Sequence, residues 1–319
     1  MQNRLSIILT VYNKEPFLRK QFDSLLSQEQ TKEGDYEVMV VNDGSTDGSV
    51  GIIEEYARQD SRVRVLNQKN QGLSMARNNG VEEAKGDYIW FVDADDVVSP
   101  KAVNLICCAI TSSPDIIPIY AQTEGEDGIR NAINPNSKTG KEILLEGKWQ
   151  SCGVFTIFKR SFLIENNLGF YPGIYHEDNE FTPRMLYAAK SVKVIPEVLY
   201  TVYHEPNSIT QVPRVKRAFD YLTVADSLNH FVEEKHEEGS PVGQVLYQRI
   251  SIAINNGLEI IVKNSKEEQA RFIEVFKGMP QLLKAMKEAK SIKYHIEAFL
   301  FKMFPNHCVE VYKTMKLFG

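Results

Sequence analysis

At residues 88–96 the chain reads Tyr88-Ile89-Trp90-Phe91-Val92-Asp93-Ala94-Asp95-Asp96. Five largely apolar residues lead into three carboxylates, a pattern typical of a buried strand that delivers negative charge to the edge of a sheet. Such charge is costly to bury unless something binds it. A divalent cation that carries a diphosphate suits these oxygens, because hard cations take oxygen ligands and often share them with substrate phosphates. The stretch therefore predicts a protein that processes nucleotides.

Other short, β-branched-rich apolar runs precede this one, and helical patterns separate them. We expect strands at 5–11, 36–41, 63–66 and 88–92, and helices at about 16–27, 46–58 and 72–84. Strands that alternate with helices imply right-handed βαβ units and a parallel sheet. Ligands bind beyond the carboxyl ends of such strands. The first, second and fourth strands should therefore end on one ligand-binding edge of an α/β fold.

The pattern changes after Pro100. A helix at 101–112, a strand at 115–120, an exposed loop or short hairpin at 124–140, and strands at 192–195 and 200–204 are predicted. From about Pro213 onward apolar residues recur at helical spacing, which predicts helices at 215–234, 241–263, 266–276 and 281–304. We expect a nucleotide-binding and catalytic domain at 1–212 and a helical region at 213–319.

The composition is that of an ordinary globular protein, with 319 residues, 43% hydrophobic and 25% charged. A formal charge of −5 argues against nucleic acid as a partner. Residues 277–319, however, hold eight Lys and three Glu, a charge of +5. This helical end is compatible with contact to an anionic membrane or with a dimer contact, and packing on the catalytic domain is the alternative. No targeting segment or bilayer-length apolar run is recognised, so we expect a cytoplasmic location or a peripheral one at the inner face of a membrane.

Polar side chains also follow the first two predicted strands. Thr10-Val11-Tyr12-Asn13 closes the first strand with an aromatic ring on which a base could stack, and Asp43 follows the second, where it could accept the imide N–H of a pyrimidine. The alternative is a pair of ordinary loops, with an Asx-turn at Asp43 and a helix that opens on Ser45-Thr46-Asp47. A shared edge with the three acids favours the ligand site.

The three acids have a structural alternative as well. A helix start favours acids through its dipole, but a capping role accounts for one carboxylate and not for three. Alternation places Asp93 and Asp95 on one side if the strand continues that far, and the role of Asp96 stays open. Arg77, in the predicted helix after Gly72, is either near diphosphate oxygens or a surface arginine.

A second acidic cluster, Tyr175-His176-Glu177-Asp178-Asn179-Glu180, precedes an apolar helix at 181–189. Acids at a helix start are the structural interpretation. In the functional one, Glu177, Asp178 or Glu180 is a general base that takes a proton from an acceptor hydroxyl. His204 follows a predicted strand, and it is either a surface residue or a contact to a metal or diphosphate.

Taken together, these segments resemble family 2 glycosyltransferases with the GT-A fold. The matching segments, in family order and at roughly family spacing, are Ser6–Asn13, Val40–Asp47, Gly72–Asn78, Phe91–Asp96 and His176–Asp178. The resemblance covers about two-thirds of the chain. It implies a Rossmann-like, mostly parallel sheet flanked by helices, with a helical C-terminal extension. It also implies inverting transfer of a sugar, with a UDP-sugar as the expected donor, to a hydroxyl of a glycan or lipid-linked acceptor.

The resemblance also implies roles for individual residues. Thr10, Tyr12, Asp43, Arg77 and Asp93 would contact the donor: Tyr12 stacks on the base, Asp43 bonds its imide, Arg77 lies near the base or phosphates, and Asp93 contacts the ribose or the sugar. Asp95 would ligate the Mg²⁺ or Mn²⁺ that holds the diphosphate, and His204, where the family often has arginine, is a second candidate metal contact. Asp178 would be the general base, with Glu177 assisting it or binding the acceptor.

Two other classes of protein stay open. A nucleotide-sugar-binding or scaffold protein that has lost catalysis would keep the donor residues. A nucleotidyltransferase also uses a parallel sheet with acidic metal ligands, but it usually has a glycine-rich, basic phosphate loop after the first strand. Tyr12-Asn13-Lys14-Glu15 does not resemble such a loop.

Overall fold

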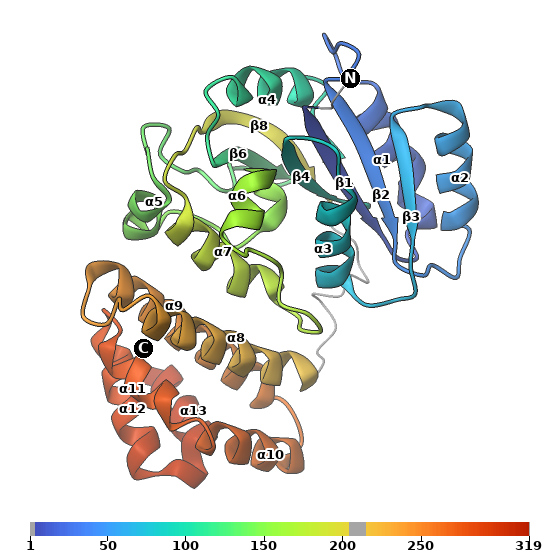
Figure 1. Ribbon diagram of the computed structural model, residues 1–319. Helices are drawn as coiled ribbons and strands as arrows, with labels where there is room; N and C mark the ends of the chain where they lie inside the picture. The colour runs from blue at the N-terminus through green and yellow to red at the C-terminus, as the bar shows by residue number, and fades with distance from the viewer. Residues whose placement is uncertain (1–3, 204–214, 319) are drawn as a thin grey trace. The chain divides into compact units, whose positions relative to one another are not determined.

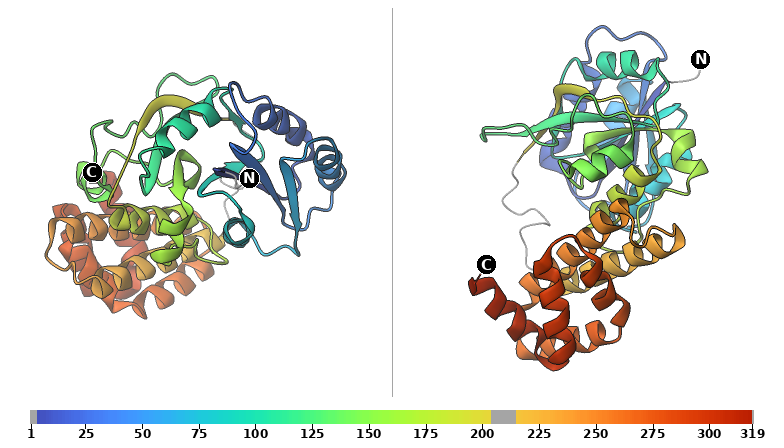
Figure 2. Two further views of the ribbon diagram at one scale, coloured as in Figure 1. Left: turned by 45° about the horizontal axis from the view of Figure 1, so that its top comes forward. Right: turned by 90° about the vertical axis from the view of Figure 1, so that its left-hand side faces the viewer.

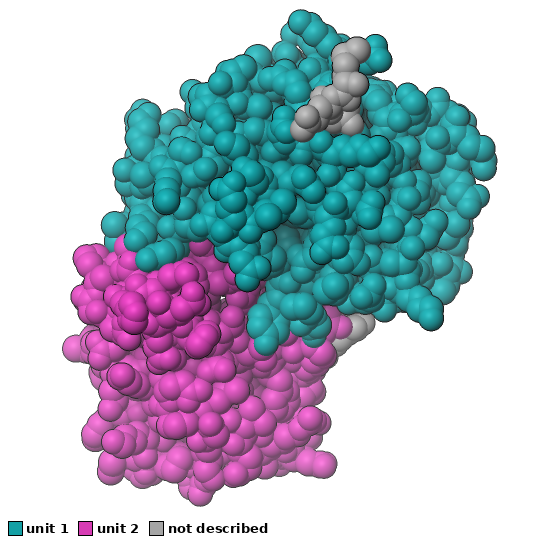
Figure 3. Space-filling model, viewed as in Figure 1, with its two compact units in different colours: residues 1–173, 185–206 teal, residues 174–184, 207–319 magenta. Residues whose placement is uncertain are grey.

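A computed structural model of the chain describes residues 4–203 and 215–318. The chain divides into two compact units, 1–173 with 185–206 and 174–184 with 207–319 (Figure 3). Helix α7 (Glu177–Ala188) is shared, because its residues up to Arg184 belong to the second unit and those from Met185 to the first. We describe each unit by itself.

The first unit is built on an eight-stranded mixed sheet with the order β3-β2-β1-β4-β7-β6-β8-β5. Its strands are β1 (Leu5–Val11), β2 (Tyr36–Asn42), β3 (Val63–Asn67), β4 (Tyr88–Asp93), β5 (Val97–Val98), β6 (Ile116–Thr123), β7 (Thr156–Lys159) and β8 (Ile195–Val202). Strands β3, β2, β1 and β4 run parallel, whereas β7 is antiparallel to both β4 and β6. Every residue of β1 and β2 is buried, as expected for strands covered on both faces.

Helices cover both faces of the parallel half of the sheet (Figures 1 and 2). The described helices of this unit are α1 (Glu15–Leu26), α2 (Ser49–Gln59), α3 (Leu73–Glu83), α4 (Ala102–Ile110), α5 (Gly140–Glu146) and α6 (Arg160–Glu165). Helices α1 and α2 lie on one face and α3 on the other, as right-handed crossovers require. Helix α3 packs so closely that a Cβ at Gly80 would lie 2.6 Å from a methyl carbon of Ile8. The fold class predicted from the sequence is confirmed.

Three details of this unit differ from the sequence predictions. Helix α2 begins at Ser49 and not in the Ser45-Thr46-Asp47 segment, because Ser45 and Thr46 bond to Asn13 instead. Strand β4 ends at Asp93, so Asp95 lies in a turn and not in a continued strand. The strands predicted at 192–195 and 200–204 are one strand, β8, and Val192 forms only an isolated bridge with Ile116.

The second unit is helical in the part that the structure describes. It contains the start of α7 and the helices α8 (Val215–Glu234), α9 (Pro241–Ile261), α10 (Lys266–Lys277), α11 (Pro280–Glu288), α12 (Ile292–Met303) and α13 (Cys308–Phe318). Helices α8 and α9 lie side by side (Figure 1). Among the described residues, no helix combines the length and hydropathy needed to cross a bilayer.

The single helix predicted at 281–304 is wrong. The chain leaves α11 at Ala289, whose ψ is 150°, and starts α12 after Ser291, which is also extended. The Ser291 amide donates to Gln248 Oε1 of α9, a partner far away in the sequence, which satisfies one backbone donor at the break. Helix α13 was not predicted at all.

A donor-type edge and an acid-bearing helix

The carboxyl ends of β2, β1 and β4 lie next to one another in the sheet. Thr10 pairs with Asp93 of β4, and Val11 pairs with Asn42 of β2, so the residues that follow these strands emerge at one edge. Thr10 itself is buried. The prediction that these strand ends meet at one edge of the sheet is confirmed. We call the group Thr10, Tyr12, Asp43, Arg77, Asp93 and Asp95 the donor edge, after the role that the sequence predicts for it.

The loops after β1 and β2 are tied to each other by hydrogen bonds. Asn13, in the left-handed region at φ 52°, donates its amide to Ser45 Oγ, and its side-chain oxygen accepts the Thr46 amide at 2.7 Å. The next amide, that of Lys14, donates to Ser49 Oγ at the start of α2. Tyr12, beside this junction, is 47% exposed. The sequence thus fixes the backbone of the loop and leaves an aromatic ring accessible beside it.

Asp43 organises the approach to α3. Its carboxylate accepts hydrogen bonds from the Gln68 amide group (2.7 Å), the Gln71 N–H (2.8 Å) and the Gly72 N–H (2.9 Å). Gly72 precedes α3 at φ 85°, a conformation that side chains other than glycine rarely adopt. Asp43 is therefore a buried carboxylate with a structural function, and an oxygen that accepts one bond keeps capacity for another.

Arg77 is buried and pairs with the last residue of β4. Its Nη2 donates to Asp93 Oδ1 at 3.2 Å, and its guanidinium lies 4.9 Å from the ring centroid of Phe170 and 6.0 Å from that of Phe91. The alternative of a surface arginine is wrong, because only 1% of the residue is exposed. The aromatic walls hold the cation in place, and Asp93 remains partly accessible.

Asp95 lies in the turn after β4 and meets a cation from the first loop. Lys14 Nζ donates to Asp95 Oδ2 at 2.7 Å, and both side chains are about one-fifth exposed. Within the described residues, no group of three His, Cys, Asp or Glu is arranged to hold a metal. The Asp95 carboxylate nevertheless has oxygens of the kind that Mg²⁺ or Mn²⁺ takes, since such cations often bind through one or two carboxylates together with substrate phosphates. His204, the other candidate ligand, lies outside the described residues.

Asp96, the third acid after Val92, is buried and hydrogen-bonded within the first unit. Its Oδ2 accepts the Tyr200 hydroxyl at 2.7 Å, and its Oδ1 accepts the Tyr203 N–H at 3.0 Å. The same tyrosine hydroxyl accepts the Asp93 N–H. Burial and the neighbouring charge of Asp93 raise the pKa of Asp96 to about 7. Asp96 therefore joins the turn after β4 to β8.

The second acidic cluster lies at the start of α7 in the second unit. Glu180 is 1% exposed, forms a bidentate ion pair with Arg184 and also accepts the Ser227 hydroxyl at 2.8 Å. Glu177 is buried, and Asp178 is half-buried. Glu180 is thus fixed as a structural acid, whereas Asp178 is the more accessible carboxylate. Asp178 and Glu177 belong to a different compact unit from the donor edge.

His176, directly before these acids, is held as a neutral ring. It stacks on Tyr221 with ring centroids 3.8 Å apart, and Arg217 donates to its Nε2. Burial, together with the charges of Arg217 and Lys216, lowers the pKa of His176 to about 4. Helix α7, with its acids, begins at the next residue, so it follows an imidazole ring that carries no charge at neutral pH.

Comparison with known proteins adds the family. The model of the family described as Glycosyl transferase family 2 matches residues 6–166. The chain belongs to glycosyl transferase family 2. This family 2 member is 32% identical over 228 residues to YibD of Escherichia coli (strain K12), an uncharacterized glycosyltransferase. That alignment covers 66% of the chain and 64% of YibD, so it spans just under two-thirds of the relative's length.

Two solved structures extend the likeness beyond the matched segment. TarS of Staphylococcus aureus, solved in complex with UDP-GlcNAc, superposes with a TM-score of 0.77 at 21% identity, and the alignment covers 98% of this chain and 90% of the solved chain. Mannosyltransferase PcManGT from Pyrobaculum calidifontis, in complex with GDP-Man and Mn²⁺, gives a TM-score of 0.51 at 16% identity over 95% and 88%. At these identities the likeness shows the fold, including the helical C-terminal region.

Two residues that contact the acids after β4, Lys14 and Tyr200, were not predicted from the sequence. The segment around Lys14 was compared only with a glycine-rich phosphate loop, and no role was predicted for the lysine itself. In the structure its ammonium group donates a hydrogen bond to Asp95. A basic residue two positions after the exposed tyrosine was the available signal. Tyr200, which binds Asp96 and the Asp93 amide, gave no such signal, because it lies more than a hundred residues away in the sequence.

Proposed function

We propose that this glycosyltransferase moves a hexose from a UDP-sugar to a hydroxyl of a glycan or lipid-linked saccharide, with inversion at the anomeric carbon and with Mg²⁺ or Mn²⁺ as cofactor. The observation that carries the proposal is the donor edge: the ends of β1, β2 and β4 bring an exposed tyrosine, two partly accessible carboxylates and a buried arginine to one edge of the sheet. Family membership supplies the reaction class.

In this proposal the donor edge binds the nucleotide. Tyr12 stacks on the base, and Asp43 accepts the imide N–H through its remaining acceptor capacity while it keeps α3 in place. Asp93 contacts the ribose or the sugar, with Arg77 holding its carboxylate in position. Thr10 lies opposite Asp93 in the register of β1 and β4. Thr10 and Asp93 are strand residues, Tyr12 and Asp43 directly follow β1 and β2, and Arg77 lies in α3.

The metal proposal rests on Asp95. Its carboxylate has the hard oxygens that Mg²⁺ and Mn²⁺ take, and His204 is the second candidate ligand. PcManGT, a protein of similar fold, was solved in complex with GDP-Man and Mn²⁺. When bound, the cation would supply positive charge for the departing diphosphate. Lys14 adds a positive charge of the protein's own at the same carboxylate, where it can also attract phosphate oxygens.

Asp178 is the proposed general base. It removes the proton from the acceptor hydroxyl on the face of the sugar opposite the leaving group, so that displacement inverts the anomeric centre without a covalent enzyme intermediate. The capture of Glu180 by Arg184 and Ser227 supports this choice. Glu177, buried at the helix start, is proposed to orient Asp178 or the acceptor.

The acceptor and the place of action are the least constrained parts of the proposal. TarS is named as a poly(ribitol-phosphate) beta-N-acetylglucosaminyltransferase, so a poly(ribitol-phosphate) chain is a first acceptor to test beside other glycans and lipid-linked saccharides. We place the reaction in the cytoplasm, at or near the inner face of the membrane. The basic C-terminal segment is consistent with that location.

A thermal-shift screen across UDP-, GDP- and dTDP-sugars, with and without Mn²⁺, tests the donor part of the proposal. A ligand that binds the folded state raises the apparent stability by mass action, and we expect the largest shift with a UDP-sugar and Mn²⁺. The sugar product formed with the best donor is then assigned by proton NMR. A product that retains the donor's anomeric configuration would contradict the inverting mechanism.

The same experiment separates the other class of protein. Binding of the nucleotide sugar without transfer to any glycan or lipid-linked acceptor would favour a nucleotide-sugar-binding or scaffold protein. If none of the nucleotides produces a thermal shift, both the transferase and the nucleotide-sugar-binding function would be contradicted.

A further inference from the structure

Helix α12 carries apolar side chains on two opposite faces. Tyr294, Ala298 and Phe301 are buried inside the second unit. On the other face Ile292, Ile296, Phe299 and Met303 are 73%, 48%, 57% and 58% exposed in the full chain. We call these four residues the outer stripe. A surface helix of a globular protein normally presents polar residues on this side.

The spacing of the outer stripe is helical and continuous. Its members stand at i, i+4, i+7 and i+11, which places them within one narrow band along the helix at about 100° per residue. Phe304, the residue after the helix, is also half exposed and extends the apolar surface. An uncovered apolar band of this length marks an interaction surface.

Lysines flank the outer stripe on both sides. By helix geometry Lys293 lies on one side of it and Lys302 on the other, and both residues are exposed. Lys293 is 3.9 Å from the buried Glu297, whereas the segment 277–319 as a whole keeps a formal charge of +5. An apolar stripe bordered by cations is the pattern of a helix that lies in a membrane interface.

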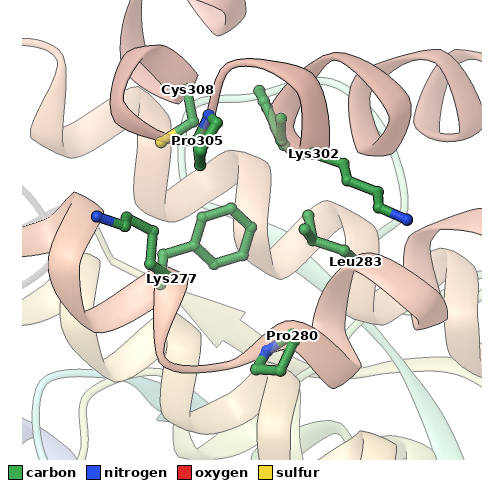
Figure 4. Close-up of a pocket in the computed structure, with 8 residues that line it drawn as sticks. Lys277, Pro280, Leu283, Lys302, Pro305 and Cys308 are labelled. Carbon is green, nitrogen blue, oxygen red and sulfur yellow. The ribbon is translucent and has the colours of Figure 1, made fainter.

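The same helix lines a pocket of about 210 Å³ (Figure 4). Its walls are largely apolar, and the Lys277 and Lys302 side chains leave it on opposite sides. The lining residues are Phe276, Lys277, Pro280, Leu283, Phe301, Lys302, Pro305 and Cys308. Lys277 is bonded to Glu274 and Asn306. Phe301, which lines the pocket, belongs to the buried face of α12, so the pocket is separate from the outer stripe.

We propose that the outer stripe of α12 docks on an anionic lipid surface. Its apolar side chains would enter the boundary between headgroups and acyl chains, and Lys293 and Lys302 would lie among the lipid phosphates. A second copy of this chain suits the surface less well, because face-to-face pairing would bring two segments of charge +5 together. Docking through α12 does not depend on the proposed donor chemistry, and it would keep the enzyme beside lipid-linked acceptors.

Vesicle flotation of the full chain, without nucleotide, tests the inference. The protein is mixed with vesicles of phosphatidylcholine containing about one-third phosphatidylglycerol, and separately with vesicles of pure phosphatidylcholine. We expect flotation with the anionic vesicles, weaker flotation with the neutral ones, and release as salt screens the lysines. Failure of the full chain to float with the anionic vesicles would overturn the proposal.

Paired variants locate the contact. Replacing Ile296→Asn together with Phe299→Asn should lower vesicle partitioning by about tenfold or more, because the apolar area that enters the lipid is lost. The matched control, Leu145→Asn with Ile164→Asn, removes two equally exposed apolar side chains from the first unit and should bind like the parent protein. Equal binding by the α12 variant and the parent would overturn the proposal.

The lysines are tested in the same way. Lys293→Gln with Lys302→Gln should weaken binding to anionic vesicles by about fivefold per lysine, with no effect on neutral vesicles. The exposed lysines Lys85 and Lys190 of the first unit, replaced by Gln, are the control. A loss of the same size in both pairs would mean that total charge, and not the outer stripe, brings the protein to the vesicle.

Sedimentation equilibrium tests whether a second copy of this chain, and not a lipid surface, covers the outer stripe. We expect the same oligomeric state in the parent and in the Ile296→Asn, Phe299→Asn variant. A dimer that becomes a monomer in this variant would show that the stripe joins two copies, and the membrane proposal would be wrong. Nucleotide binding, measured separately by thermal shift, reports on the donor edge, so a failure of the proposed function and a failure of this inference are distinguishable.

Discussion

The end of β4 with the turn that follows it carries three acids, as does the first turn of α7, and the acids of each cluster differ in burial. After β4, Asp96 is buried against Tyr200, while Asp95 stays accessible beside Lys14. On α7, Glu180 is buried in an ion pair with Arg184, while Asp178 stays half-buried. In each cluster, therefore, one acid supports the fold and another remains available for chemistry. The clusters differ in the origin of one cation: Lys14 reaches Asp95 from another element, whereas Arg184 reaches Glu180 from the same helix.

The largest expected effect comes from the accessible acid of α7. Asp178→Asn should lower the rate of sugar transfer by about 10²–10⁴-fold, the usual contribution of a general base, with nucleotide binding kept within a small factor. Single-turnover transfer and a UDP titration measure the two quantities separately. Full transfer activity in this variant would assign the base to another residue, with Glu177 the next to examine.

Glu180, the buried acid of the same cluster, should act on stability instead. Glu180→Gln leaves Arg184 without its buried carboxylate, and we expect the free energy of unfolding to fall by about 3 kcal/mol. Urea denaturation measures this loss. Glu234→Gln, at an exposed carboxylate that pairs with Lys235, is the matched control and should change the free energy of unfolding far less. Equal losses would mean that burial does not separate the two kinds of acid.

The neutral histidine predicts a pH dependence of stability. Because the pKa of His176 is about 4 in the folded protein, below its ordinary value in the unfolded chain, the unfolded state binds more protons between these values. The free energy of unfolding should therefore fall as the pH drops from about 6.5 to about 4, by at most about 3 kcal/mol from this residue.

The test is urea denaturation across that pH range. His176→Asn removes the titration and still tolerates the positive φ of this position, so its stability should depend less steeply on pH. His230→Asn, at an exposed histidine of α8, is the control and should follow the parent protein. A slope unchanged by His176→Asn would contradict the buried, neutral ring.

The smallest effect is expected at the buried acid after β4. Asp96 has a pKa of about 7, so at neutral pH a neutral side chain of the same shape should replace it at a cost of only about 1–2 kcal/mol. In Asp96→Asn, the side-chain oxygen can keep the Tyr203 N–H and the new amide can donate to the Tyr200 hydroxyl, whose own proton then loses its acceptor. Thermal denaturation measures the change. A loss of several kcal/mol would show that Asp96 is needed as a carboxylate.

The donor edge was predictable because its information is local. The apolar runs that become β1, β2 and β4 end at polar residues, and the rule for parallel strands brings those ends together. Thr10, Tyr12, Asp43, Asp93 and Asp95 could therefore be located from sequence alone. The burial of Arg77 could not, since it depends on Phe91 and Phe170, which approach only in the folded unit.

Which acid of each cluster is buried depends in part on partners that are distant in the sequence. Asp96 is fixed by Tyr200, and Glu180 by Ser227, which lie 104 and 47 positions away in the sequence. In the C-terminal helices, the apolar repeat predicted helix but neither the break at Ala289–Ser291 nor which face of α12 would be buried. Periodicity fixes spacing along one helix, whereas burial is decided by the elements that pack against it.

The central claim is that the accessible acid after β4 binds a metal-linked nucleoside diphosphate. Isothermal titration of UDP in the presence of Mn²⁺ tests it on the parent protein, on Asp95→Asn and on Asp96→Asn. We expect UDP to bind the parent protein and Asp96→Asn in a Mn²⁺-dependent way, and the binding to Asp95→Asn to be at least about tenfold weaker, since a ligand to the metal is lost. Binding to Asp95→Asn equal to that of the parent protein would contradict the account.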